Sequence, residues 1–116
     1  AVEPPKDGLM STVQVPWDRL SGRAALAIYV NEVTVHTWDL ARSTDQEPEW
    51  DTEVLATSLA AVHAELPLPE RAPIWEAVAA QLPGDAPFDP PFGDAVPVPE
   101  DAPLLDRVMA WNGRQP

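Results

Sequence analysis

The stretch RAALAIYVNEVTVHTWDLARS, residues 23–43, is rich in alanine and contains neither proline nor glycine. Such a composition and length favour a long helix, which we predict from Arg23 to about Ser43. At 100° per residue, two adjoining stripes can be drawn along this helix. One contains Ala25, Ile28, Tyr29, Glu32, His36, Asp39 and Ser43. The other contains Leu26, Val30, Val33, Thr37 and Leu40. Only Asn31 and Arg42 share a clearly polar face, so most of the helix is expected to be buried.

Two further helices are predicted next along the chain. Asp51 is a good N-cap for a helix from about Thr52 to Glu65. A third, shorter helix is expected from Pro69 or Glu70 to Leu82, because Pro73 is tolerated only near the start of a helix.

Proline shapes the rest of the C-terminal half. Residues 83–100 contain too many prolines for a helix or a central strand, and we expect an ordered belt that lies across the helices through its apolar side chains. Asp101 is then expected to cap a last helix from about Ala102 to Asn112, with Gly113 as its stop.

The N-terminal part is less regular. Residues 1–10 are polar and proline-rich, and we expect a flexible segment there. The alternation of Val13, Val15 and Trp17 predicts one short strand or an extended lead-in. Residues 11–116 should therefore form one mainly helical domain.

Composition excludes several classes of function. The chain has 116 residues with 19 acidic and 7 basic side chains, for a net charge of -12, which excludes unaided binding to nucleic acid or to an anionic membrane surface. The absence of cysteine excludes disulfides, thiolate metal sites and cysteine nucleophiles. There is no signal-peptide pattern and no apolar run long enough to span a bilayer, so a cytoplasmic location is expected.

The residues best suited to bind a metal ion lie in the first predicted helix. Glu32 and His36 are one helical turn apart, so their side chains project from the same face, and Asp39 follows a turn later. A carboxylate and an imidazole suit a divalent transition metal, with Asp39 as an outer partner of a ligand or as an ion-pair partner of Arg42 or Arg23. The alternative is that Glu32 and His36 pair without a metal or face water.

Two ligands are too few for a catalytic zinc site, which usually has three. His63 is the only other histidine. A surface or packing role suits His63 better than a role as the third ligand, because it would have to approach from the second helix.

Two segments resemble a known family. They are Val35-His-Thr-Trp-Asp-Leu-Ala-Arg42, with Glu32 four residues before the histidine, and Pro91-Phe-Gly-Asp-Ala-Val-Pro-Val-Pro-Glu-Asp-Ala-Pro-Leu-Leu-Asp-Arg107. Both resemble stretches of the actinobacterial DinB-like metal-binding proteins related to mycothiol-dependent maleylpyruvate isomerase, and they occur in the same order. The resemblance covers residues from about Ser11 to Arg114, which correspond to the C-terminal half of the family's usual length.

The resemblance implies a DinB-like helical bundle with a divalent metal, commonly zinc or nickel, held by three side chains. Two of these ligands fall on Glu32 and His36, and the first, a histidine on an upstream helix, has no counterpart in this sequence. The resemblance further implies a transferase or isomerase that uses a small thiol such as mycothiol. The alternative is a non-catalytic binding module that keeps the scaffold without a complete metal site.

The missing ligand and the apolar first helix both indicate that other helices, which this sequence does not contain, complete the bundle. A helix with few polar positions needs partners on most sides, and the other predicted elements supply about half of them. We therefore expect the chain to be a fragment that forms a homodimer or that pairs with a complementing N-terminal half.

Overall fold

The computed structural model describes residues 12–15, 18–84 and 87–116. Within these ranges a two-stranded hairpin precedes four helices, in the order β1 (Thr12–Val15), β2 (Asp18–Ser21), α1 (Gly22–Ser43), α2 (Thr52–Glu65), α3 (Ala72–Ala79) and α4 (Leu104–Trp111). The predicted mainly helical class is confirmed. No helix in the described part of the chain is long and apolar enough to cross a membrane.

The two long helices begin where their caps predict. The Ser21 hydroxyl accepts a hydrogen bond from the amide of Ala24 at 3.2 Å, and α1 then runs unbroken to Ser43. The Asp51 carboxylate accepts bonds from the amides of Glu53 and Val54, so α2 starts at Thr52 as predicted. Both caps satisfy amide donors that have no partner within the helix.

The N-terminal segment contains more strand than predicted. β1 pairs with β2 in antiparallel register from Thr12 opposite Ser21 to Val15 opposite Asp18. The expected short strand is therefore present, together with a second strand that the sequence did not indicate. Trp17 and the flexible segment predicted for residues 1–10 lie outside the described residues.

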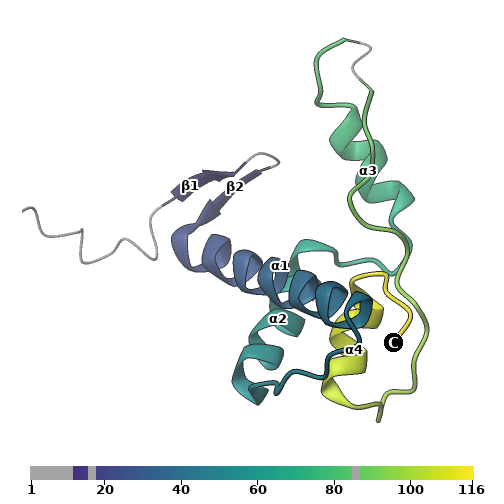
Figure 1. The fold of residues 1–116 in the computed structure, drawn as a ribbon. Helices are drawn as coiled ribbons and strands as arrows, with labels where there is room; N and C mark the ends of the chain where they lie inside the picture. Colours follow the sequence, from purple (N-terminus) through teal and green to yellow (C-terminus); the bar gives the residue numbers. More distant parts are fainter. Residues whose placement is uncertain (1–11, 16–17, 85–86) are drawn as a thin grey trace, which may run out of the picture.

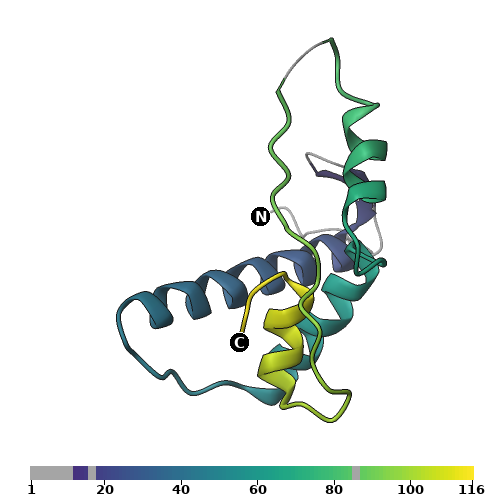
Figure 2. The same cartoon turned by 90° about the vertical axis from the view of Figure 1, so that its right-hand side faces the viewer.

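The core lies on one side of α1. Figures 1 and 2 both show α2 and α4 beneath this long helix, on the same side. Val35 from α1, Leu55 from α2, and Val108 and Met109 from α4 form the buried cluster, and Trp38 and Trp50 pack against it. Burial of these side chains is the main favourable contribution to the packing of the three helices.

Polar side chains also join α1 to its neighbours inside the core. The buried amides of Asn31 and Asn112 bond to each other in both directions, at 2.8 and 3.0 Å. The Ser58 hydroxyl of α2 donates to the Thr34 hydroxyl at 3.1 Å. The prediction that Asn31 lies on a polar face is therefore wrong, because the amide of Asn112 satisfies it in the interior.

The opposite side of α1 is uncovered, so the prediction that most of this helix is buried is wrong for the single chain. Its exposed apolar side chains, called here the α1 stripe, have exposed fractions of 56, 52, 67 and 64% for Leu26, Tyr29, Val33 and Leu40. α2 and α4 cover only one face of the helix. Scattered exposed apolar residues are ordinary, whereas a contiguous patch marks an interaction site.

The third helix and the belt form an arm. α3 is shorter than predicted and stands apart from the other helices, while the chain from residue 87 returns beside it (Figure 1). The Trp75 indole donates to the carbonyl of Phe92 at 2.9 Å, which ties the two segments together. Only the end of the belt lies across the helices, where the amide of Val96 donates to the carbonyl of Ala110 at 2.8 Å.

The last helix differs from prediction at its start. α4 begins at Leu104 after Pro103, and no side chain caps it, so Asp101 is not its N-cap. Its end is as predicted: Gly113 has a φ of +82°, and the amide of Arg114 donates to the carbonyl of Met109. Glycine adopts this left-handed conformation without the steric cost that other residues carry.

Candidate functional site

The predicted ligands Glu32 and His36 lie side by side on α1. His36 Nε2 is 3.3 Å from Glu32 Oε2, and the two side chains are 67 and 33% exposed. The site is therefore accessible from solvent, at the border between the buried face of the helix and the α1 stripe. The expectation that a bundle encloses the pair does not hold within this single chain.

The separation of these two atoms fits a shared metal ion. Two ligands at 2.0–2.1 Å from a tetrahedral zinc ion lie about 3.3 Å apart, which agrees with the observed 3.3 Å. The same separation is also that of a direct ion pair between the two side chains. The donor set, one imidazole and one carboxylate, suits zinc or nickel.

Asp39 lies on the other side of the imidazole. Its Oδ2 is 3.6 Å from His36 Nδ1. Its carboxylate accepts two hydrogen bonds from the Arg114 guanidinium, from Nε at 3.2 Å and from Nη2 at 2.9 Å. A carboxylate beside the distal nitrogen of a histidine orients the ring for metal binding. The structure thus assembles a row of charged groups in the order Arg114, Asp39, His36 and Glu32.

The prediction that Asp39 pairs with Arg42 or Arg23 is wrong. Arg42 lies over the Trp38 ring, with its guanidinium carbon 4.9 Å from the ring centre, and Arg23, which is exposed, forms no described contact with Asp39. Arg114 was not predicted because it is 75 residues away in sequence. Only the turn after α4 brings it to α1.

The described residues supply no third ligand to this pair. Among the described residues, no group of three His, Asp or Glu side chains is arranged to hold a metal ion. Asp39 faces the nitrogen of His36 that points away from Glu32, so it does not converge with the other two. We therefore call Glu32 and His36 together the half-site, a pair of candidate ligands with open positions toward solvent.

His63 has a packing role. Its ring lies on that of Trp111, with the ring centres 4.1 Å apart. Burial, and then the positive charges of Arg107 and Arg71, lower the pKa of His63 below its ordinary value of 6.5. The contact with Trp111 agrees with the packing role expected from the sequence.

This lowered pKa predicts a pH dependence of stability. Below pH 6.5 the unfolded chain binds a proton at position 63 more readily than the folded chain, so the free energy of unfolding falls as pH decreases from 6.5 toward the folded-state pKa. We expect the stability advantage of the wild type over His63→Gln to shrink between pH 7.5 and 5.5 in urea denaturation. An advantage that stays constant over this range would contradict the prediction.

The sequence analysis missed Arg71, which is 1% exposed. Its guanidinium donates to the backbone carbonyls of Leu66, Leu68, Gly93 and Trp111. It thereby joins the end of α2, the arm and the end of α4. One signal was available, because Arg71 is the only lysine or arginine between Arg42 and Arg107.

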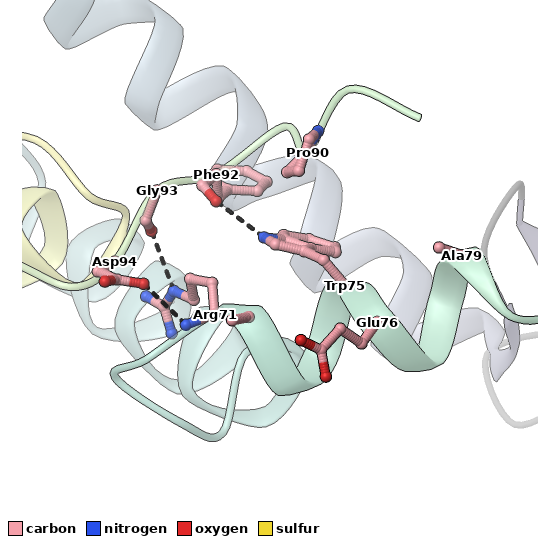
Figure 3. A pocket seen from close by; sticks show the side chains of 9 residues that line it. Arg71, Trp75, Glu76, Ala79, Pro90, Phe92, Gly93 and Asp94 are labelled. Carbon is pink, nitrogen blue, oxygen red and sulfur yellow. Dashed lines mark hydrogen bonds between the residues drawn. The ribbon is translucent and has the colours of Figure 1, made fainter. Parts of the chain in front are cut away.

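A groove of about 550 Å³ lies beside Arg71, between α3 and the returning chain (Figure 3). Trp75 and Phe92 form much of its wall, together with Pro90, and Glu76 lies at its edge. The polar atoms of Arg71 and the indole nitrogen of Trp75 are already bonded to backbone carbonyls. The groove is mostly apolar, and of its two carboxylates, Glu76 and Asp94, the second already accepts a hydrogen bond from the Arg71 amide at 2.9 Å.

Comparisons with known protein families, with curated proteins and with solved structures find no match to this chain.

Proposed function

We propose that this chain is a metal-binding module that supplies Glu32 and His36 to a divalent zinc or nickel site. The observation that carries the proposal is the 3.3 Å separation of His36 Nε2 and Glu32 Oε2, with both atoms on one side of α1. Asp39, held by Arg114 on the far side of the imidazole at 3.6 Å, supports it, because metal-binding histidines commonly have a carboxylate on that side.

The fold and the chemistry of this proposal follow the resemblance of residues 35–42 and 91–107. We propose that the chain is the C-terminal half of a DinB-like bundle and that the complete assembly is a transferase or isomerase using a small thiol such as mycothiol. A bound metal ion would supply a positive charge that stabilises the thiolate form of that thiol. The residues of this chain would hold the ion and leave positions open for the thiol.

The α1 stripe indicates how the half-site is completed. Tyr29 and Val33 lie next to His36 on the helix surface, and both are more than half exposed. An element that covers this stripe would also cover the half-site, and it would thereby remove water and bring a third ligand. Either a second copy or a complementing N-terminal half could supply that element.

A non-catalytic interaction module is the second candidate. It is favoured by the lack, within the described ranges, of three side chains arranged to hold a metal, together with the exposed α1 stripe. Under this function the stripe binds a partner, and Glu32 and His36 form a simple ion pair. The two functions differ in whether the purified protein binds zinc through these two side chains.

The first test is metal binding. We expect purified protein to bind zinc, and the double variant Glu32→Ala/His36→Ala to lose at least about 100-fold in affinity, because neither proposed ligand remains to hold the ion. Isothermal titration calorimetry and elemental analysis would measure this. The matched control is Glu76→Ala/His63→Ala, which removes a glutamate and a histidine elsewhere, and equal zinc binding by both double variants would overturn the proposal.

A further inference from the structure

We propose that the element completing the half-site is a second copy of this chain, whose α1 packs antiparallel on the α1 stripe. This inference rests on the proposed function, since it names the source of the missing ligands. In the resulting dimer, Glu32 and His36 of both copies would surround one metal ion on the twofold axis.

Three of the four residues of the stripe are spaced symmetrically along the helix, and the fourth, Tyr29, has the exposed Thr37 as its counterpart. Leu26 and Leu40 each lie seven residues from Val33, on opposite sides of it, and all three are more than half exposed. A spacing of seven residues is typical of helices that pack along a shared seam. When a second α1 runs antiparallel with its Val33 opposite this one, each Leu26 meets a Leu40 of the other copy. The stripe is thus complementary to itself, as a twofold interface requires.

The same symmetry brings the two half-sites together. Glu32 and His36 lie on one flank of the stripe, and in an antiparallel pair of helices the same flank of each helix faces its counterpart. The midpoint of this pair is position 34, one residue and about 1.5 Å along the axis from Val33. With Val33 on the twofold axis, Glu32 of one copy is therefore displaced by about 3 Å along the helix from both Glu32 and His36 of the other copy, so all four side chains lie close to the axis.

This arrangement supplies what the single chain lacks. Two carboxylates and two imidazoles offer four candidate ligands, one more than the three that an open catalytic zinc site takes, so a position remains for the thiol. Each chain contributes two, which agrees with the absence of a third converging ligand among the described residues of one chain. The stoichiometry is therefore one metal ion for every two chains.

Charge makes the association depend on the metal. Each chain has a net charge of -12, so two copies repel one another over the distances that salt does not screen. A divalent cation between the two glutamates opposes that repulsion at the point of contact. We therefore expect the dimer to form with zinc and to dissociate when a chelator removes it.

The experiment measures mass and metal content together. In light scattering after gel filtration, we expect protein with zinc to have twice the 12.6 kDa mass of the chain and to hold half an equivalent of zinc per chain, and protein in chelator to be monomeric. A monomer holding one zinc per chain would overturn the shared site and leave the proposed function standing. Failure to bind zinc at all would overturn both.

Two matched variants test the interface itself. Val33→Lys places like charges against each other on the twofold axis, and Val54→Lys makes the same change at an exposed position of α2. We expect Val33→Lys to stay monomeric with zinc and to bind it at least tenfold more weakly, with an unchanged circular dichroism spectrum. Val54→Lys should behave as the wild type. A Val33→Lys protein that still dimerises with zinc would overturn the inference, as would a dimer lost equally in both variants.

Discussion

Replacing Arg71 by methionine is expected to lower the free energy of unfolding by on the order of 3–5 kcal/mol, which is a large part of the stability of a small domain. The guanidinium is buried, and its donors bond to the carbonyls of Leu66, Leu68, Gly93 and Trp111. Methionine would fill the space of the side chain but remove the donor to the carbonyls of Leu68, Gly93 and Trp111, whereas the Leu66 carbonyl keeps its bond from the Trp111 indole. Unlike an ion pair replaced as a unit, the backbone acceptors cannot be removed together with the arginine.

Urea denaturation followed by circular dichroism would measure the loss. Arg71→Lys should recover only part of it, because a single ammonium group cannot reach acceptors on three segments as the planar guanidinium does. The control is Arg23→Met on the exposed side of α1, which we expect to change stability by less than about 0.5 kcal/mol. A loss below about 1 kcal/mol for Arg71→Met would show that water replaces the guanidinium at these carbonyls.

The second large effect is expected at the buried amide pair. Asn112→Leu should cost on the order of 2–3 kcal/mol, because it removes both bonds to Asn31 and leaves that amide buried without a partner. It also removes the bond from Asn112 to the carbonyl of Val108. Asn31→Leu should cost a similar amount for the same reason.

A double-mutant cycle separates the pair from its surroundings. The variant with leucine at both positions leaves neither amide unsatisfied, so its loss should be smaller than the sum of the single losses by about 1 kcal/mol or more. Gln81→Leu, at an exposed position beyond α3, is the control for a polar residue changed to leucine. Single losses that simply add would mean that the two amides act independently despite their contact.

The amide pair also bears on the half-site. Asn31 precedes Glu32 directly, so anchoring its side chain to Asn112 fixes the rotation of α1 about its axis. That rotation places Glu32 and His36 at the edge of the exposed face and keeps Asp39 within reach of Arg114. Loss of the pair should therefore weaken zinc binding as well as stability.

Local signals predicted the two long helices well. Residues 23–43 lack proline and glycine, and Asp51 offers a carboxylate to the first amides of α2, so these elements depend on interactions within a few residues. The start of α4 was misplaced because Asp101 competes with Pro103, whose fixed backbone angle begins the helix later. Similarly, α3 ends early, at Ala79, before a turn at Gly84.

Burial was predicted less well, for a physical reason. Periodicity shows which side chains share a face of a helix but not which face another element covers. Asn31 is buried because Asn112, 81 residues away, satisfies its amide, whereas Leu26 and Val33 are exposed because no other helix of the described residues covers that face of α1. The buried role of Arg71 was not predicted for the same reason, since the backbone carbonyls that accept its hydrogen bonds come from segments far apart in sequence.

The candidate site was predictable in part. A spacing of four residues on a helix brings Glu32 and His36 together, and the structure places them 3.3 Å apart. The contact of Asp39 with Arg114 depends on the left-handed turn at Gly113, which no pattern near residue 39 reveals. Whether the pair binds metal remains the prediction that the zinc measurements address.

The arm is a suitable place to attach a label or a tag. Residues 81–84 near its tip are exposed, and Gly84, whose φ is +65°, is best kept as glycine because a side chain there would be strained. Exposed loop tips of this kind tolerate inserted sequence. A fluorophore or an immobilisation tag attached at residues 81–83 would report on the protein while leaving both the core and α1 untouched.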